Sequence, residues 1–219
     1  MRVPSIPQKR YLEATQVFHW ATMEQYVKWF TGDVKRHGRT EIVLKRLADK
    51  GKILRKRYGK RYVYAARRRR GYTKIYHGLV CTECLIRICH SKFGQVIRES
   101  KFYGCGSIPE WGIIYDTTIL LFEFCSKDNF KRKGRMTAKI NRYHQNLSRI
   151  EDRFGAKPVI LFVIEDKRQK VKEFVETEMP LGDFVFTDFS TFLRIPLGRA
   201  LKSQIYFWWS GDQVETISL

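Results

Sequence analysis

The chain has 219 residues, of which 43% are hydrophobic and 14% aromatic, so it has ample material for an apolar core and wholesale disorder is excluded. Its formal net charge of +20 is spread unevenly: residues 1–70 hold 20 Lys and Arg against 5 Asp and Glu, and the remaining 149 residues hold 22 against 17. This concentration of positive charge predicts a polyanionic partner for the N-terminal third.

The sequence also indicates a compartment. No stretch approaches the ~18 consecutive apolar residues of a membrane span, and the first residues lack the apolar segment of a secretory signal. Five cysteines, an odd number in a chain of this length, favour reduced thiols over a disulfide framework. We therefore expect a cytoplasmic protein without a membrane association.

Two amphipathic helices are expected in the N-terminal third. Residues 22–30 and residues 40–53 each carry apolar side chains at helical spacing, and a turn with two glycines separates them. The face of the second helix that points away from the apolar stripe is basic, and its residues are candidates for DNA binding: Arg39, Lys45, Arg46 and Lys50.

A basic hairpin is expected next, over residues 52–66, with its turn at residues 58–60. Its tip carries Arg57, Lys60 and Arg61. The order helix, turn, helix and basic hairpin resembles a winged helix-turn-helix. In that class the second helix lies in the major groove while the hairpin contacts phosphate or the minor groove. The resemblance implies that the partner is double-stranded DNA.

Four consecutive arginines follow the hairpin. Adjacent like charges repel one another and resist burial, so we expect an arginine-rich linker over residues 67–71 that crosses a phosphate backbone. The sequence thus divides into a basic DNA-binding domain at residues 1–66, this linker, and a second domain at residues 72–219. The arginines of the linker are further candidates for DNA binding: Arg67, Arg68, Arg69 and Arg70.

The second domain has a recognisable order of elements. The pattern predicts a helix over residues 78–93, strands over 95–102, 110–116 and 117–125, a long helix over 135–151, a strand over 157–166, a helix over 167–179 and a strand over 183–189. This α-β-β-β-α-β order resembles the core of the PD-(D/E)XK nuclease superfamily, which has a restriction-endonuclease-like fold. The fold class expected for the whole chain is therefore α/β, with a central mixed sheet in the second domain.

Two acids lie at neighbouring strand ends of this domain. Glu110 follows Pro109, and Glu123 lies near the end of the next strand. Hydrolysis of a phosphodiester needs a divalent cation to carry the developing charge, and Mg²⁺ prefers carboxylate oxygens. Glu110 and Glu123 are therefore the candidate metal ligands, with Glu83 on the preceding helix as a third acid. Mg²⁺ or Mn²⁺ is the cofactor expected if the site is active.

A nuclease of this kind also needs a cation near the attacking water. The superfamily places a lysine two residues after the second acid, but that position here is Cys125. Lys127 and Lys139, the latter on the following helix, are candidates for the missing ammonium. Two interpretations stay open: a metal-dependent DNA endonuclease, and a nuclease-like domain that has kept DNA binding without chemistry, which the missing lysine favours.

A narrower resemblance rests on a short set of residues. Pro109–Glu110, Glu123, and Lys139 with Tyr143 four residues later are similar to the pattern of the replication-relaxation family, whose members place a winged helix before such a domain. The resemblance implies a DNA-binding protein that acts in replication, maintenance or mobilisation of a plasmid, phage or similar mobile element. It also implies replication or mobilisation proteins as partners. Four adjacent aromatic residues at 206–209 predict a buried strand or the seam of a homodimer.

Overall fold

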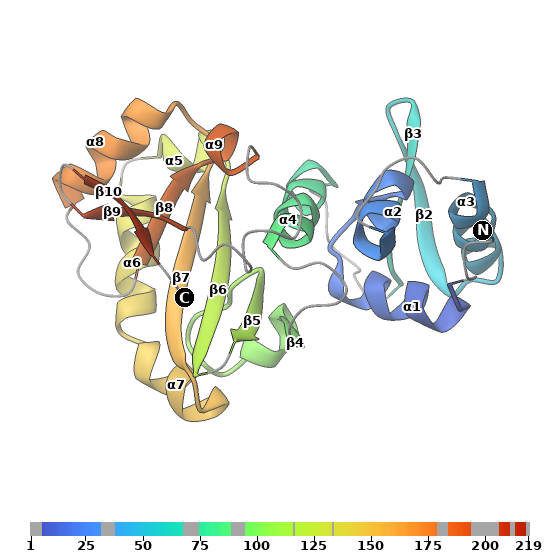
Figure 1. The fold of residues 1–219 in the computed structure, drawn as a ribbon, viewed down its shortest axis with the longest axis horizontal. Coiled ribbons are helices and arrows are strands. Elements are labelled where there is room, and N and C mark those ends of the chain that lie inside the picture. The colour runs from blue at the N-terminus through green and yellow to red at the C-terminus, as the bar shows by residue number, and fades with distance from the viewer. Residues whose placement is uncertain are drawn as a thin grey trace. The chain divides into compact units, whose positions relative to one another are not determined.

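The computed structural model describes residues 6–31, 38–67, 75–88, 95–115, 117–132, 134–178, 184–193, 206–210 and 213–217. The chain divides into two compact units, Met1–Ser91 and Lys92–Leu219. Both units combine helices with strands, which confirms the predicted mixed α/β class (Figure 1). None of the helices in the described ranges is long and apolar enough to cross a membrane.

The first unit is built from helices around a small antiparallel sheet whose strand order is β1-β3-β2. The helices expected over residues 22–30 and 40–53 are present as α2 and α3, and the hairpin expected over residues 52–66 is β2–β3. The described elements are α1 (Gln8–Val17), β1 (Ala21–Thr22), α2 (Met23–Thr31), α3 (Gly38–Asp49), β2 (Ile53–Tyr58), β3 (Arg61–Ala66) and α4 (Ile75–Ile88).

Helix α1 was not predicted from the sequence, because the face it buries is small and partly polar. Its buried residues are Tyr11, Ala14 and Thr15, and two of them bond to other helices. The Tyr11 and Thr40 hydroxyls lie 3.0 Å apart, and the Thr15 and Tyr26 hydroxyls lie 2.6 Å apart. These buried hydrogen bonds fix α1 against α2 and α3. Because they join polar side chains, they do not appear in the spacing of apolar residues from which helices are predicted.

Helix α4 belongs to the first unit, although the sequence placed it in the second domain, after a boundary at residues 67–71. It begins at Ile75, three residues before the predicted start, and Ile75 joins an apolar cluster with Trp20, Val63 and Ala65. At Gly78 the packing is so close that a Cβ atom would lie 2.8 Å from Trp20 Cδ1. Packing of this kind holds α4 on the first unit, so the division of the chain follows α4 instead of preceding it.

The second unit contains a five-stranded mixed sheet of order β4-β5-β6-β7-β8. The pairs β4–β5 and β5–β6 are antiparallel, whereas β6–β7 and β7–β8 are parallel. Parallel neighbours need crossover connections, which α6 with α7 and then α8 provide. The strands are β4 (Gln95–Arg98), β5 (Trp111–Tyr115), β6 (Thr118–Cys125), β7 (Lys157–Ile164) and β8 (Phe184–Asp188), and the crossover helices are α6 (Arg135–His144), α7 (Leu147–Phe154) and α8 (Arg168–Glu178).

Shorter elements complete this unit. Residues Glu99–Phe102 form a 3-10 turn, which ends the strand predicted over 95–102 after four residues and buries Phe102. The remaining described elements are α5 (Lys127–Phe130), α9 (Phe189–Leu193) and an antiparallel hairpin of β9 (Tyr206–Ser210) and β10 (Gln213–Ile217).

The main core of the second unit lies between the sheet and its crossover helices. Ile119 and Leu121 of β6 share this core with Met136, Ile140 and Tyr143 of α6. Side chains along a strand alternate between the two faces of a sheet, so every second residue of β6 from Ile119 onward points toward α6. Glu123 falls in that series, and the strand therefore delivers its carboxyl group to the helix side.

The helix predicted over residues 135–151 is broken in two. Asn146 Nδ2 donates to the Arg142 carbonyl oxygen at 2.7 Å, and the Asn146 backbone N–H donates to the Tyr143 carbonyl oxygen instead. An asparagine that occupies the carbonyl four residues before it competes with the helical hydrogen bond. This local competition ends α6 and lets α7 begin in a new direction.

The division after α4 has a direct test. A fragment of residues 1–91 is expected to unfold cooperatively in urea, whereas a fragment of residues 1–67 should lose native near-ultraviolet circular dichroism. Without α4 the shorter fragment exposes Trp20, Val63 and Ala65, and burial of a large apolar side chain contributes about 1.5–3 kcal/mol. A stable, cooperative 1–67 fragment would contradict this assignment of α4.

Candidate functional site

The candidate site in the second unit is built around Glu123. This residue lies on β6 and is only 1% exposed, and its apolar chain neighbours Phe122 and Phe124 point to the opposite face of the sheet. A carboxylate removed from water at such a position needs hydrogen-bond donors or an opposite charge. Helix α6 supplies both, because its buried face is turned toward this part of the strand.

Lys139 and Tyr143 are the two donors, one helical turn apart on α6. The Lys139 Nζ forms an ion pair with Glu123 Oε2, and the Tyr143 hydroxyl donates to Glu123 Oε1 at 2.6 Å. Burial of the phenol, reinforced by the adjacent carboxylate, raises the pKa of Tyr143 well above its usual value, so it remains a donor at neutral pH. Each carboxylate oxygen of Glu123 therefore has a protein partner.

The charges of this cluster influence one another. Burial raises the pKa of Glu123 above its ordinary value, and the nearby Glu110 carboxylate adds to the rise while Lys139 and Tyr143 oppose it. Burial alone would lower the pKa of Lys139, but the adjacent Glu123 carboxylate outweighs it and raises that pKa. The side chain of Lys139 is 38% exposed, so Lys139 contacts both the buried carboxylate of Glu123 and the solvent.

The structure thus brings together three of the predicted residues, Glu123, Lys139 and Glu110. Glu110 acts on Glu123 through its charge, and its backbone N–H donates to the Phe122 carbonyl oxygen at 3.0 Å. The fourth, Lys127, opens helix α5, and its backbone N–H donates to Glu165 Oε2 at 3.3 Å. Cys125, at the position where the superfamily has lysine, is buried, and burial raises the pKa of its thiol to about 11. That thiol stays protonated at neutral pH and carries no charge.

Glu83 is held by the first unit. Its carboxylate accepts hydrogen bonds from Lys28 Nζ at 2.9 Å and Gln25 Nε2 at 3.3 Å, and it pairs with Arg87 at 3.3 Å. The contacts with Lys28 and Gln25 link α4 to α2 and explain the position of an acid on a largely apolar helix. The carboxylate is occupied as a structural ion pair, so the described contacts give it no role as the third acid of a metal site.

The donor set around Glu123 fits a divalent ion poorly. A metal ligand needs an oxygen lone pair directed at the ion, yet both oxygens of Glu123 already accept from Lys139 and Tyr143. An ammonium in contact with the carboxylate also repels a cation from the same place. Glu110 is near enough for its charge to act on Glu123, but both oxygens of Glu123 are engaged by the protein itself.

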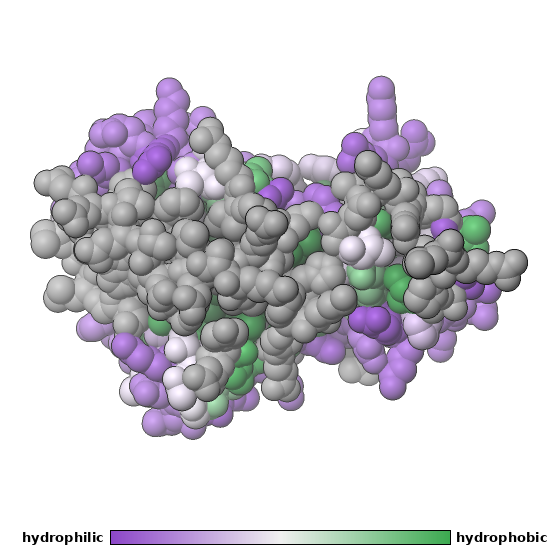
Figure 2. All heavy atoms as spheres, viewed as in Figure 1, coloured by the Kyte–Doolittle hydropathy of each residue, from purple (hydrophilic) through white to green (hydrophobic). Residues whose placement is uncertain are grey.

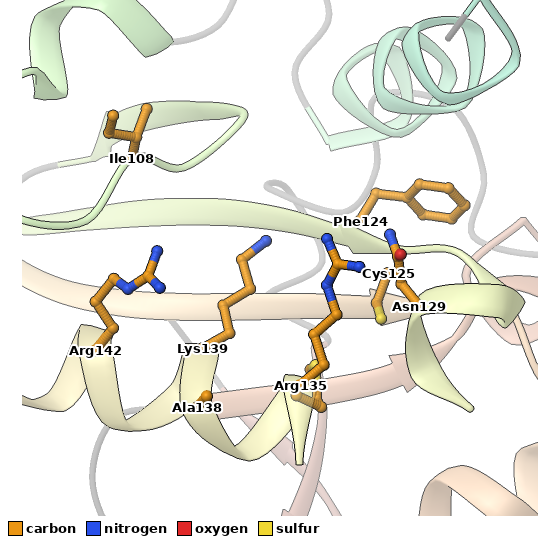
Figure 3. A pocket seen from close by; sticks show the side chains of 9 residues that line it. Ile108, Phe124, Cys125, Asn129, Arg135, Ala138, Lys139 and Arg142 are labelled. Atoms are coloured by element: carbon orange, nitrogen blue, oxygen red, sulfur yellow. The ribbon is translucent and has the colours of Figure 1, made fainter. Parts of the chain in front are cut away.

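A pocket of about 380 Å³ opens beside Lys139 (Figure 3). Figure 3 shows Arg135, Lys139 and Arg142 reaching into it from α6, with Asn129 of α5 at one end. None of the described residues that line the pocket is acidic. Its remaining walls are apolar or weakly polar: Ile108, Phe124, Cys125, Met136 and Ala138. Arg135 was not singled out in the sequence, since its role depends on the rotation of α6 about its axis.

The second candidate site is the basic surface of the first unit. All four residues predicted on the outer face of α3 are exposed, as are the three at the hairpin tip, where Arg61 also pairs with Glu24 at 3.8 Å. The β2–β3 hairpin projects from the unit and its surface is hydrophilic (Figures 1 and 2). The exposed residues in question are Arg39, Lys45, Arg46, Lys50, Arg57, Lys60 and Arg61.

The predicted linker is described only at its first residue. Arg67 is exposed, and its Nη1 donates to the Gly51 carbonyl oxygen at 3.2 Å, at the end of α3. Arg67 is therefore attached to the same unit as the basic helix. Arg68, Arg69 and Arg70 lie outside the described residues.

Two features of this surface are not apparent in the sequence. Ile42, on α3, is 60% exposed and lies beside Lys45 and Arg46 at helical spacing. On the hairpin, the Arg55 guanidinium lies 3.7 Å from the centroid of the Tyr62 ring, which is itself half exposed. An exposed isoleucine among cations and an arginine stacked on a tyrosine both add apolar contact area to a charged face.

Comparisons of the chain with protein-family models, with curated proteins and with solved structures found no match.

The ion pair at Glu123 gives a measurable stability signature. Replacing Lys139 by Met should lower the free energy of unfolding by about 1–3 kcal/mol at pH 8, because a buried carboxylate loses its charged partner. The double variant Glu123→Gln with Lys139→Met should recover part of this loss. Urea unfolding measures both. The matched control is Lys172→Met, which removes a partly exposed pair with Glu176 whose carboxylate is not buried, and it should cost less than about 0.5 kcal/mol.

The pH dependence of the Lys139→Met variant has a defined sign. A carboxyl group whose pKa is higher in the folded than in the unfolded state binds protons preferentially when folded, so its folding free energy improves as the pH falls through that raised pKa. Since Lys139 opposes the rise, its removal raises the pKa of Glu123 further. The stability deficit of the variant should therefore shrink between pH 8 and pH 5, and a constant deficit would contradict the pairing.

Proposed function

We propose that this protein is a DNA-binding protein whose first unit, a winged helix, grips double-stranded DNA, and whose second unit is a nuclease-like domain without metal-dependent chemistry. The observation that carries the proposal is the exposed cationic surface of α3 and the hairpin tip within one unit. Helix α3 would lie in the major groove and the β2–β3 hairpin on the adjacent backbone. Replication, maintenance or mobilisation of a plasmid, phage or similar element is the setting that the resemblance of the sequence favours.

The arrangement of the first unit supports this mode of binding. Leu44 and Leu47 of α3 are buried in the unit, so the opposite face with Lys45 and Arg46 is free to meet a partner. When cationic side chains neutralise DNA phosphates, condensed counterions are released. This release favours binding and makes the affinity fall as the salt concentration rises. Ile42, exposed in the same face, offers an apolar contact of the type that distinguishes the thymine methyl group in the major groove.

The topology of the second unit supports the nuclease-like assignment. Three antiparallel strands, a helical crossover and a parallel fourth strand follow in the order that the sequence predicted. The loss of chemistry is inferred from Glu123, whose two oxygens are engaged, and from Cys125, whose thiol cannot replace the missing lysine. Without catalysis, such a domain contributes contacts to nucleic acid or to replication and mobilisation proteins.

An active Mg²⁺- or Mn²⁺-dependent endonuclease is the second candidate function. It is favoured by one observation: Glu110 is close enough to Glu123 to raise its pKa, and Lys139 supplies an ammonium beside the same carboxylate. In this alternative, nucleic acid or the ion would have to draw Lys139 and Tyr143 away from Glu123.

Binding by the first unit is tested with charge variants. The triple variant Lys45→Gln, Arg46→Gln, Lys50→Gln should weaken duplex binding at least tenfold in a gel shift at 0.1 M salt. The dependence of log affinity on log salt concentration should also flatten, by about 0.9 for each phosphate that the variant no longer neutralises. The triple variant Lys167→Gln, Arg168→Gln, Lys170→Gln removes the same charge from an exposed region of the second unit. Equal losses in the two variants would argue against a specific role for α3.

Catalysis is tested on supercoiled plasmid with Mg²⁺ or Mn²⁺. We expect the plasmid to remain intact at protein concentrations that shift it completely in a gel. Metal-dependent nicking that disappears in Glu123→Ala, with the gel shift unchanged, would establish the endonuclease instead. Nicking that survives this substitution would point to a contaminating nuclease.

A further inference from the structure

Three cationic side chains line the pocket beside α6, and neither DNA binding by the first unit nor a metal site explains them. Arg135, Lys139 and Arg142 are four and three residues apart on one helix, which separates them by about 6 Å and about 4.5 Å along its axis and keeps them within one face. All three line the same cavity, and Figure 3 shows their side chains directed into it. Both arginines stay exposed to solvent while lining the pocket, so the three cations border an open hollow that an anion can enter.

None of the described residues that line this pocket is acidic, although Glu123, Glu110 and Glu165 lie close enough for their charges to act on Lys139 or Cys125. Glu123 neutralises Lys139 from below, and neither Arg135 nor Arg142 forms an ion pair with an acid among the described residues. Helix α6 begins at Arg135, with no acidic residue in its first turn, so the positive end of the helix dipole adds to the guanidinium charge. The described lining residues therefore contribute three positive charges and no negative one.

The walls of the pocket are held in place. Ser107 Oγ donates to the Arg142 carbonyl oxygen at 3.1 Å, and Asn146 Nδ2 donates to the same oxygen at 2.7 Å. Gly106, at φ +79°, lies so close to Asn146 that a Cβ atom there would meet Oδ1 at 2.1 Å. These contacts fasten the segment that carries Ile108 to the end of α6, so both sides of the pocket keep their spacing without a ligand.

We propose that this pocket binds the phosphate group of a nucleotide unit, either free or within a single strand of nucleic acid. Guanidinium groups match phosphate oxygens through paired hydrogen bonds, which Arg135 and Arg142 would supply, and Asn129 adds an amide donor. The volume of about 380 Å³ exceeds what a bare phosphate needs and lies within the range of about 300–1,000 Å³ usual for small-molecule sites. Ile108 and Phe124 give the attached sugar and base an apolar wall.

Arginine modification followed by peptide mass spectrometry tests the site in the full-length protein. Phenylglyoxal reacts with accessible guanidinium groups, and both Arg135 and Arg142 are exposed. Thymidine 5′-monophosphate or a five-residue oligothymidylate should slow modification of these two arginines at least threefold. Arg168, exposed on α8 of the same unit, is the internal control and should react at an unchanged rate.

Five compounds identify the chemistry of the ligand and its source. Thymidine without phosphate should give no protection, and sodium chloride at matched ionic strength should give none. Inorganic phosphate should protect only at higher concentration than the nucleotide, and the concentrations needed for the nucleotide and the oligothymidylate show whether a free nucleotide or a strand is preferred. Absence of protection by every phosphate compound, or equal protection by chloride, overturns the proposal.

Two variants provide an independent test of the same site. In Arg142→Gln, protection of Arg135 should require at least tenfold more nucleotide, whereas Arg168→Gln should leave it within twofold. Should Arg142→Gln prove unstable, the protection pattern of the unaltered protein still decides. The phosphate site lies in the second unit alone, so the two experiments are independent. Failure of duplex binding in the gel shift would refute the proposed function and leave the phosphate site standing. Absence of arginine protection would refute the phosphate site and leave duplex binding standing.

Discussion

The second unit depends on one buried acid. Glu123 lies two residues before the end of the apolar strand β6 at 1% exposure, a position where an unpartnered carboxylate would be strongly destabilising. Lys139 and Tyr143 satisfy it from one turn of α6, and this double contact fixes the rotation of the helix about its axis. Once that rotation is set, Arg135 and Arg142 must face the same pocket as Lys139. The charge of the pocket is thus a consequence of how the acid below it is satisfied.

A second constraint acts at the other end of α6. Asn146 takes the Arg142 carbonyl oxygen away from the helical pattern, and the close approach of Gly106 to Asn146 brings the segment before β5 against the helix terminus. The first constraint sets which side chains face the pocket, and the second sets the distance between its two walls. Both rest on polar contacts between elements far apart in the sequence, inside a core that is otherwise apolar.

Much of the second unit could be predicted from local patterns. The apolar run of β6 with a single Glu, and the spacing of Lys139 and Tyr143, are visible in the sequence, and the elements from β4 onward follow one another along the chain as predicted. What could not be predicted depends on tertiary partners. The allocation of α4 to the first unit rests on Trp20 and on the pairing of Glu83 with Lys28, and no local pattern of α4 reveals either contact.

The position of Lys139 links the two interpretations of the site. In a metal-dependent nuclease, the acid must present its oxygens to the ion while the ammonium stays near the attacking water. Here the Lys139 ammonium holds one oxygen of Glu123 and the Tyr143 hydroxyl holds the other, so the side chains that satisfy the buried acid occupy the oxygens that a metal ion would need. If Lys139 moved away, the buried carboxylate would depend on the arriving cation alone. Under the proposed function, Lys139 would be retained without catalysis, because the folded core needs its charge beside Glu123 whether or not the site binds a metal.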